Sequence, residues 1–182
     1  MTEEQKGVKV VNIVVSADLG HDIPLEKMAA TLPNTEYNPE QFPGLVLRIK
    51  DPKTSALIFS SGKIVSTGAR SMKKVHESLE RIKETLKEIG IEIKKTPEVE
   101  IQNIVASGNI GMNLNLNVLA LKLDNTEYEP EQFPGLVYKL MEAKATFLLF
   151  SNGKIVCTGT KTEDGVGTAV DKLIKKLEKV KA

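Results

Sequence analysis

Residues 34–46 read NTEYNPEQFPGLV, and residues 125–137 read NTEYEPEQFPGLV. The two stretches lie 91 residues apart, and they differ at one position, which is Asn38 in the first and Glu129 in the second. The chain has 182 residues, so this offset is half of its length. Self-similarity at a fixed offset is the signature of an internally repeated structure. We therefore expect the chain to contain one structural unit twice.

Other segments recur at the same offset without a gap. Residues 60–68 read SSGKIVSTG and recur at 151–159 as SNGKIVCTG, and Asn-Ile-Val occurs at both 12–14 and 103–105. We interpret the chain as two copies of one αβ unit, residues 1–91 and residues 92–182, joined near Thr96-Pro97-Glu98.

The composition is that of a globular protein, with 41% apolar and 27% charged residues. The single cysteine, Cys157, excludes an internal disulfide, so the expected setting is reducing and aqueous. No apolar run approaches the roughly 18–20 residues that a membrane-spanning helix needs. The net charge of +1 gives no indication of a nucleic-acid-binding protein.

The pattern of one unit predicts strands, one short helix and one long helix. β-branched residues predict a strand over 8–16, and further strands are expected over 45–49, 55–59 and 63–67. Pro24 is suited to the start of the short helix. An apolar stripe that begins at Val75 predicts a long helix over 71–89, and the register recurs in the second copy from Val166. The glycine-ended loop 60–62 should pair Phe59 with Lys63 and Leu57 with Val65.

Two helices can cover only one face of such a sheet, whereas several strands are apolar on both faces. The second face would carry Asn12, Val14, Leu57, Phe59, Val65 and Thr67. A large uncovered apolar face is typical of a binding surface.

Four of the five phenylalanines form two duplicated pairs, Phe42 with Phe59 and Phe133 with Phe150. With the first hairpin centred between residues 50 and 51, and the second between 141 and 142, the members of each pair lie roughly opposite each other. Phe42 stands among prolines and a glycine, in a turn-like setting. Patterning alone leaves two interpretations open, packing in the core or an exposed wedge.

These motifs closely resemble the TATA-box-binding protein family. The resemblance rests on Glu-Tyr-x-Pro-Glu-Gln-Phe-Pro-Gly-Leu-Val, on the strand ends Leu-Ile-Phe and Leu-Leu-Phe, on Ser-x-Gly-Lys-Ile-Val-x-Thr-Gly and on Asn-Ile-Val. It covers about residues 8–180 in both copies, and the short N-terminus looks like the archaeal form. The resemblance implies an α+β fold, in which a pseudo-twofold repeat forms a saddle-shaped, ten-stranded antiparallel sheet with helices on the convex face.

The resemblance also implies a general transcription initiation factor that binds the minor groove of TATA-box promoter DNA. The two phenylalanine pairs would intercalate and bend the DNA, which an A·T-rich sequence with deformable steps would favour. Minor-groove contacts would come from Asn12, Val14, Leu57, Val65, Thr67, Asn103, Val105, Leu148, Val156 and Thr158. Phosphate contacts would come from Arg48, Lys63, Arg70, Lys139, Lys154 and Lys161.

A nearly twofold surface reads the direction of a promoter poorly, so direction should come from differences between the copies or from a partner. In the family, the second of the two homologous loops binds transcription factor B, which in turn recruits RNA polymerase. The resemblance therefore assigns Glu129, Glu131 and Gln132 to the contact with transcription factor B. We hypothesise that the extra negative charge of Glu129 makes transcription factor B bind the second loop and not the first. Val11 departs from the glutamine that is common in the family, whereas Gln102 keeps it. Residues 17–23 and 108–115 receive no role.

Simpler interpretations remain open for several residues. The strand asparagines could be edge or bulge residues, the lysines and arginines could be merely solvated, and the loop glutamates could serve solubility. The strongest alternative function is a protein-interaction scaffold that dimerises through its open face, and a homodimer of the free DNA-binding protein is also expected.

No enzyme, metal or cofactor is predicted. The two histidines, His21 and His76, are neither duplicated nor spaced as metal ligands, and neither Gly62-Lys63 nor Gly165-Val166-Gly167 completes a phosphate-binding loop. We expect a location on promoter DNA without membrane contact, which means the cytoplasmic nucleoid for an archaeal-type protein or the nucleus of a eukaryote.

Overall fold

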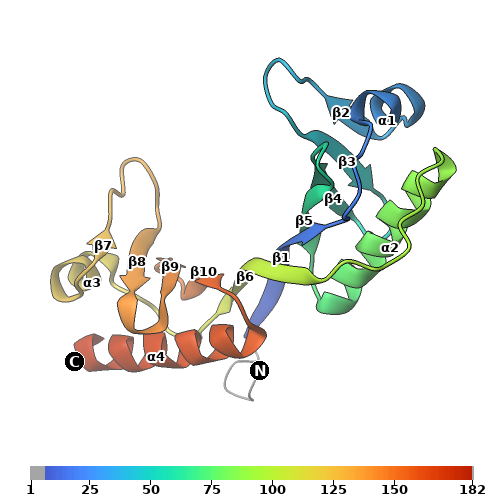
Figure 1. Ribbon diagram of the computed structural model, residues 1–182. Helices are drawn as coiled ribbons and strands as arrows, with labels where there is room; N and C mark the ends of the chain where they lie inside the picture. Colours follow the sequence, from blue (N-terminus) through green and yellow to red (C-terminus); the bar gives the residue numbers. More distant parts are fainter. Residues whose placement is uncertain (1–6, 182) are drawn as a thin grey trace. The chain divides into compact units, whose positions relative to one another are not determined.

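The computed structural model describes residues 7–181 and shows the same element order twice (Figure 1). The first repeat contains β1 (Val8–Asp18), α1 (Leu25–Thr31), β2 (Thr35–Tyr37), β3 (Leu45–Ile49), β4 (Thr54–Ile58), β5 (Lys63–Ala69) and α2 (Met72–Glu88). The second contains β6 (Val99–Asn109), α3 (Leu116–Lys122), β7 (Thr126–Glu127), β8 (Leu136–Leu140), the 3-10 turn η2 (Met141–Ala143), β9 (Ala145–Leu149), β10 (Lys154–Thr160) and α4 (Glu163–Lys181).

The strands belong to one open, ten-stranded antiparallel sheet. Its order is β2-β3-β4-β5-β1-β6-β10-β9-β8-β7, so that β1 and β6 occupy the centre and the short strands β2 and β7 form the edges. The prediction of an α+β fold with a ten-stranded antiparallel sheet is therefore confirmed.

The chain forms two compact units, and their boundaries do not coincide with the repeat boundary. The N-terminal unit comprises Asn12–Gln102, and the C-terminal unit comprises Asn103–Ala182 together with the chain up to Val11. The first residues of β1 thus belong with the second repeat, and the first residues of β6 belong with the first. The division of the sequence at residues 91 and 92 stays a prediction, and residues 1–6 and 182 lie outside the described residues.

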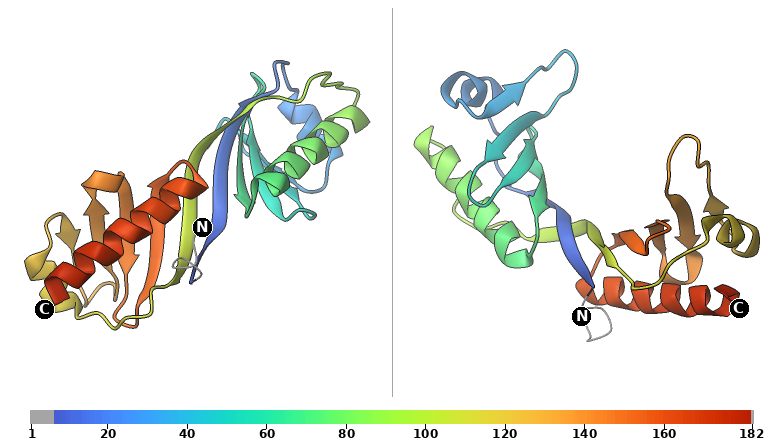
Figure 2. Two further views of the ribbon diagram at one scale, coloured as in Figure 1. Left: turned by 90° about the horizontal axis from the view of Figure 1, so that it is seen from below. Right: turned by 180° about the vertical axis from the view of Figure 1, so that it is seen from behind.

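Within each unit a long helix covers one face of the strands (Figure 2). On α2 the side chains of Val75, Leu79, Ile82 and Leu86 are buried, as the apolar stripe predicts. Ser71 caps the helix, because its side chain accepts a hydrogen bond from the Lys74 amide at 3.2 Å. In the strands, buried residues alternate with half-buried ones, for example in β4 and in β9. Each unit therefore has one helix-covered face and one open face.

Most predicted elements are present, with two differences. The edge strands β2 and β7 have three and two residues, which is too short for a hydrophobic period to reveal them. The hairpin centres were wrong by one residue, because Leu45 pairs with Ile58 and Leu136 with Leu149. The predicted turn at 60–62 is confirmed, since the Phe59 amide donates to the Lys63 carbonyl and Leu57 pairs with Val65.

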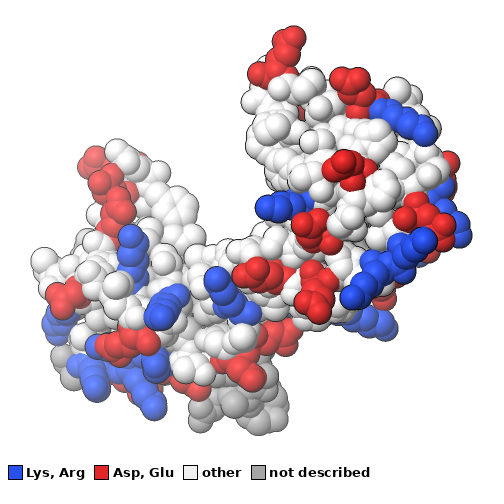
Figure 3. All heavy atoms as spheres, viewed as in Figure 1, with Lys and Arg blue, Asp and Glu red and all other residues white. Residues whose placement is uncertain are grey.

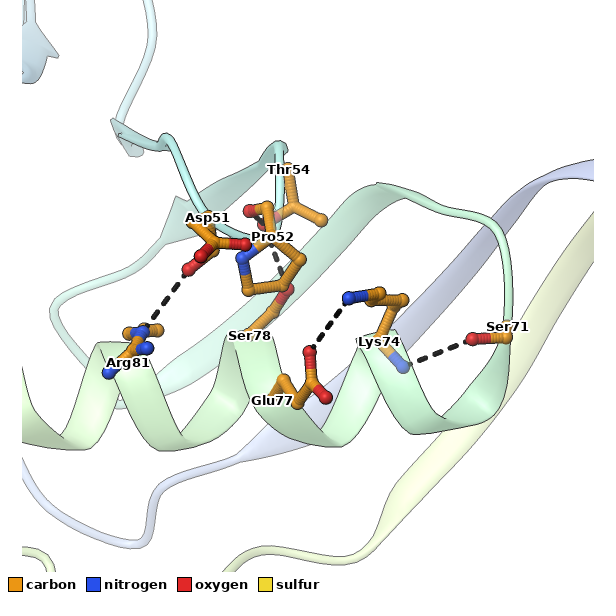
Figure 4. Close-up of polar contacts among 8 residues, drawn as sticks. All are labelled: Asp51, Pro52, Thr54, Ser71, Lys74, Glu77, Ser78 and Arg81. Carbon is orange, nitrogen blue, oxygen red and sulfur yellow. Dashed lines mark hydrogen bonds and ion pairs between the residues drawn. The ribbon is translucent and has the colours of Figure 1, made fainter.

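A buried polar pair joins the β3–β4 turn to α2 in the first repeat (Figure 4). The hydroxyls of Thr54 and Ser78 lie 2.9 Å apart, and both residues are buried. Beside them, Arg81 Nε donates to the carbonyl of Asp51 at 3.1 Å. In the second repeat, alanines stand at both positions of the hydroxyl pair, Ala145 and Ala169. One repeat therefore stabilises this contact with a hydrogen bond and the other with apolar packing.

Candidate functional site

The open face of each unit carries the residues that the sequence places there. In the N-terminal unit Val14, Leu57 and Val65 are half-buried, while their strand neighbours Ile13, Val15, Ile58 and Ile64 are fully buried. In the C-terminal unit Val105, Leu148 and Val156 are likewise half-buried. Strand alternation adds four residues that the sequence analysis did not assign, namely Val46, Ser55, Val137 and Thr146, all half-buried.

Asn12 lies on this face and holds a bulge of the neighbouring strand β5. The pairing shifts between Ile13, which faces Ala69, and Val15, which faces Ser66, so β5 carries one extra residue there. Gly68 adopts φ +104° at this point, and its amide donates to Asn12 Oδ1 at 2.6 Å. The same arrangement joins Asn103 Oδ1 to the Gly159 amide at 2.7 Å. The asparagines are therefore neither edge nor bulge residues themselves, because the extra residues lie in β5 and β10. Each asparagine side chain holds the bulge of the neighbouring strand, and this contact fixes its orientation.

The bulge amides determine which end of each asparagine side chain is the donor. A backbone N–H requires an acceptor, so Oδ1 must face the glycine and Nδ2 must face away from it. Nδ2 of Asn12 donates to Thr67 Oγ1 at 3.0 Å, and Nδ2 of Asn103 donates to Thr158 Oγ1 at 2.9 Å. An amide nitrogen carries two hydrogens, so each asparagine retains one donor for a ligand on the open face.

The two predicted phenylalanine pairs are present. The ring centroids of Phe42 and Phe59 lie 5.9 Å apart in an edge-to-face arrangement, and those of Phe133 and Phe150 lie 6.0 Å apart. Phe42 is 45% exposed and Phe133 is 44% exposed, which excludes the interpretation as core residues. Large aromatic side chains seldom remain this exposed in pairs, so each pair is a candidate contact surface.

A glycine next to each pair makes room for the rings. A methyl group placed on Gly44 would lie 2.7 Å from Phe42 Cε2 and 3.1 Å from Phe59 Cε1. The corresponding group on Gly135 would lie 2.7 Å from Phe133 Cε2. These glycines are functional candidates that the sequence analysis quoted in a motif but did not assign to the site.

The predicted phosphate-binding cations are all exposed: Arg48, Lys63, Arg70, Lys139, Lys154 and Lys161. Lys63 shares strand parity with Val65 and Thr67, so it belongs to the open face of β5. Arg48 pairs with Glu36 at 3.2 Å, but both side chains are more than half exposed, and such surface pairs contribute little. Arg48 therefore remains available to an anionic ligand.

The two rim lysines of β5 and β10 differ in their neighbours. Lys63 faces Asp18 across the strands, whereas the equivalent Lys154 faces Asn109. A hollow of about 670 Å³ beside Phe59 and Lys63 is also lined by Glu98 and Glu100. Asp18 beside Lys63 is replaced by the neutral Asn109 beside Lys154, so the open faces of the two units differ electrostatically at these lysines.

The two homologous loops have the same backbone turn but different charges. The carbonyl of Asn38 accepts from the amides of Gln41 and Phe42 at 3.0 Å, and the carbonyl of Glu129 accepts from Gln132 and Phe133 at 3.0 Å. The side chain at this position is exposed in both loops. Glu127, Glu129 and Glu131 are all exposed, and acidic side chains gather over the second loop (Figure 3).

The described residues offer little for catalysis or metal binding. Residues 7–181 contain no cluster of three or more His, Cys, Asp or Glu side chains that could hold a metal ion. Burial raises the pKa of the Cys157 thiol to about 11, which keeps this side chain protonated and unreactive at neutral pH.

Comparison with known proteins identifies the family. The model of the family described as "Transcription factor TFIID (or TATA-binding protein, TBP)" matches residues 7–89 and again residues 98–180. This chain belongs to the TATA-binding protein family. The double match agrees with the internal repeat, and it confirms the resemblance that the sequence motifs indicated.

Individual relatives of the TATA-binding protein family match nearly the whole chain. The TATA-box-binding protein of Pyrococcus furiosus is 48% identical over 172 residues, covering 94% of this chain and 90% of that protein. That of Methanosphaera stadtmanae is 54% identical over 174 residues, covering 93% of each. The solved structure of Methanococcus jannaschii TBP superposes with a TM-score of 0.88 at 46% identity, covering 95% of this chain and 99% of that one.

Members of the TATA-binding protein family are DNA-binding transcription factors, so the family agrees with the prediction that this chain is not an enzyme. None of the helices described in residues 7–181 is long and apolar enough to cross a membrane.

Proposed function

We propose that this protein binds the minor groove of TATA-box promoter DNA through its open faces and acts as a general transcription initiation factor. One observation carries the proposal: each open face combines half-buried valines and leucines with an asparagine donor and an exposed phenylalanine pair. The family relationship supports the same ligand, because the relatives named above are TATA-box-binding proteins.

The chemistry of the open face favours A·T base pairs. In the minor groove A·T pairs present only acceptors, whereas G·C pairs add the exocyclic amino donor of guanine. The asparagines supply donors through Nδ2, and their Oδ1 atoms are already occupied by the Gly68 and Gly159 amides. The surrounding valines and leucines cannot accept a hydrogen bond from guanine. A guanine amino group pressed against these valines and leucines would therefore remain unpaired, at a cost of about 1–3 kcal/mol.

The phenylalanine pairs would act as wedges at the two ends of the contact. TATA-box-binding proteins are themselves the standard example of apolar side chains that enter base steps from the minor groove and kink the duplex. Unstacking costs about a few kcal/mol per step, which the larger contact surface of bent DNA offsets. In this chain Phe42 and Phe133 project from loops, while Phe59 and Phe150 follow the ends of β4 and β9 and support them.

The rim cations would bind phosphates. Neutralising six phosphates gives a slope of about −5 in a plot of log affinity against log salt concentration. Because the net charge is only +1, this attraction is local and does not arise from a field around the whole molecule.

Recruitment of transcription factor B and then of RNA polymerase would begin at the second loop. Its exposed Glu129, Glu131 and Gln132 form an acidic surface that suits a basic partner. In the absence of DNA, the open apolar faces would favour a homodimer. We place the protein on promoter DNA, in the nucleoid of an archaeal-type cell or in the nucleus of a eukaryotic one.

Footprinting on a TATA promoter, with and without transcription factor B, tests the proposal. We expect protection of the A·T-rich element by the protein alone, and an extended footprint of one orientation when the factor is added.

A circular-permutation gel assay tests the wedges separately. The double variant Phe42→Ala/Phe133→Ala should bend the DNA much less. The double variant Leu121→Ala/Met141→Ala, which removes exposed apolar groups elsewhere, should bend it normally. Equal protection of a G·C-rich duplex would refute the minor-groove assignment.

A further inference from the structure

The outer surface of α4 differs in charge from the equivalent surface of α2. Lys175, Lys176 and Lys179 of α4 correspond to Glu84, Thr85 and Glu88 of α2, at the repeat offset of 91 residues. One position keeps its charge, since Lys172 corresponds to Arg81. Even the contact of that conserved cation is kept: Arg81 Nε donates to the Asp51 carbonyl at 3.1 Å and Lys172 Nζ donates to the Glu142 carbonyl at 3.4 Å.

The lysines form a continuous row on one flank of the helix. Lys172, Lys176 and Lys179 are spaced by four and three residues and therefore share a flank, with Lys175 at the outermost position. The same helical spacing puts the acidic residues Asp171 and Glu178 on the opposite flank. In the view of Figure 3, basic side chains gather over the C-terminal half of α4.

Part of this charge is already neutralised, and part is not. Lys176 Nζ lies 2.9 Å from Glu142 Oε1, in an exposed ion pair between α4 and η2. Lys175 and Lys179 are exposed, and neither forms an ion pair within the described part of the chain. Lys175 and Lys179 thus remain without a bonded carboxylate, beside and at the end of the row.

Two large apolar side chains accompany the lysine row. Met141 begins η2, which packs on α4, and it is 68% exposed. Leu121 is 88% exposed on α3, and the next residue, Lys122, donates to the Val180 carbonyl near the end of α4. At the equivalent positions the first repeat has Lys50 and Ala30. Apolar groups have therefore replaced a charged and a small residue on the same side of the unit that gained lysines.

Helix stability alone does not account for this pattern. Lysines near a helix C-terminus interact favourably with the helix dipole, but α2 is stable with Glu84 and Glu88 at the corresponding positions. Nor does a stability argument explain exposed Met141 and Leu121, since apolar groups in water contribute nothing to the core. Cations beside exposed apolar side chains fit a ligand that offers both carboxylates and apolar groups.

We propose that this α4 surface is a docking site for an acidic protein segment that contains large apolar side chains. The site lies on the helix-covered side of the C-terminal unit, away from Val105 and Val156 on the open face, so DNA and the acidic segment can be bound together. We define the α4 surface as Leu121, Met141, Lys172, Lys175, Lys176 and Lys179.

A peptide-binding experiment with the full chain tests this proposal. The probe is a short fluorescein-labelled peptide of glutamates and leucines, and binding is followed by fluorescence anisotropy. The variant Met141→Lys/Lys175→Glu/Lys179→Glu gives the α4 surface the first-repeat residues at these three positions, and it should weaken binding by about tenfold or more. The control Lys87→Glu/Lys94→Gln, on the N-terminal unit, changes the net charge by the same −3 as the triple variant, and it should bind like the original protein.

The reciprocal change provides a gain-of-function test. Lys50→Met/Glu84→Lys/Glu88→Lys transfers the charge and the apolar group to the first repeat, and it should raise the stoichiometry from one peptide per chain to two. Binding of a TATA duplex should be the same in all of these proteins, which separates this proposal from the DNA-binding one. A thermal melt of each variant checks that it is folded. If the variant Met141→Lys/Lys175→Glu/Lys179→Glu does not fold, the single variant Lys179→Glu replaces it in the binding test.

Three results would overturn the proposal. The first is absence of peptide binding by the unchanged chain. The second is equal binding of a peptide in which serines replace the leucines, because attraction would then be purely electrostatic. The third is displacement of the peptide by a random duplex together with a loss of duplex binding in the α4 variant, which would make this surface a nucleic-acid site.

Discussion

The Gly68 amide donates to Asn12 Oδ1 at 2.6 Å, and this contact makes the asparagine both a structural clamp and a directed donor. Asn12→Asp tests the two roles separately. Aspartate keeps an oxygen for Gly68, but it replaces the outward Nδ2 donor with an acceptor that would face the acceptors of A·T pairs. We expect unchanged folding by urea denaturation and at least about a tenfold loss of TATA affinity in gel shift, since one misplaced hydrogen bond costs about 1–3 kcal/mol.

Asn12→Ala is the matched comparison for that experiment. It removes the acceptor as well, so the bulge amide of Gly68 loses its partner, and the free energy of unfolding should fall by about 1–2 kcal/mol. If Asn12→Asp bound TATA DNA as tightly as the original chain, the donor role assigned to Nδ2 would be wrong.

Gly44→Ala should impair bending without unfolding the protein. Its methyl group would meet Phe42 Cε2 at 2.7 Å, so the ring must rotate away from Phe59. Both rings border solvent, which lets them move at little cost in stability. We expect a smaller bend angle by fluorescence resonance energy transfer between the ends of a TATA duplex, with a nearly unchanged melting temperature. Gly44 does not adopt a positive φ, so the added methyl group crowds the two rings and does not strain the backbone. A normal bend in Gly44→Ala would show that the ring positions are not critical.

The hydroxyl pair of Thr54 and Ser78 should show strong coupling in a double-mutant cycle. Removal of either hydroxyl alone leaves a buried group with a poorer partner, and each single alanine variant should lose about 1–3 kcal/mol of unfolding free energy. Thr54→Ala/Ser78→Ala reproduces Ala145 and Ala169 of the second repeat, so it should lose clearly less than the sum of the single variants. Chemical denaturation of the four proteins measures this, and simple additivity would contradict the assigned hydrogen bond.

Lys154→Ala should weaken DNA binding more than Lys63→Ala. Asp18 faces Lys63 and offsets part of its attraction for phosphate, while Lys154 faces the neutral Asn109. The variant Asp18→Asn copies the second repeat, and its Oδ1 can still accept from the Gly20 amide as Asp18 does. We expect it to raise affinity about two- to threefold at low salt and to remove the difference between the two lysine variants. Identical losses for both lysines in a salt titration would argue against an electrostatic difference between the ends.

Glu129→Asn should weaken the ternary complex with transcription factor B while sparing DNA binding. The loop backbone should persist, because Asn38 makes the same two carbonyl contacts in the first loop. Loss of one charge at a rim contact acts mainly on the association rate, so we expect a several-fold slower assembly by surface plasmon resonance. Asn38→Glu is the control in the other loop. An unchanged ternary affinity and rate would reject Glu129 as the residue that selects the loop.

The sequence predicted the parts of the fold that rest on period and repetition. The long strands, the helix from Ser71 and the open face follow from alternation and from the spacing of Val75, Leu79 and Ile82. The edge strand β2 was not predictable, because three residues carry no period. The duplication of Phe42 and Phe59 identified the two phenylalanine pairs even though local patterning left core packing open.

The remaining site features depend on contacts between distant residues. Asn12 and Gly68 are far apart in the chain, and only the pairing of β1 with β5 shows that the asparagine holds the bulge. The crowding of Phe42 against Gly44 and the pair of Asp18 with Lys63 likewise require the three-dimensional register. Sequence reasoning named most residues of the candidate site, whereas the structure adds the remaining ones and shows which of them contact one another.

The compact units exchange strand ends: the start of β1 groups with the second repeat, and the start of β6 groups with the first. In a polypeptide of one repeat, only the later part of the first strand would thus have packed within its own chain. Such an ancestor could have completed its fold as a homodimer in which two identical copies exchanged the ends of their first strands. Fusion of two genes would then have made that partnership permanent, and it freed each half to acquire mutations that a symmetric homodimer would have imposed on both.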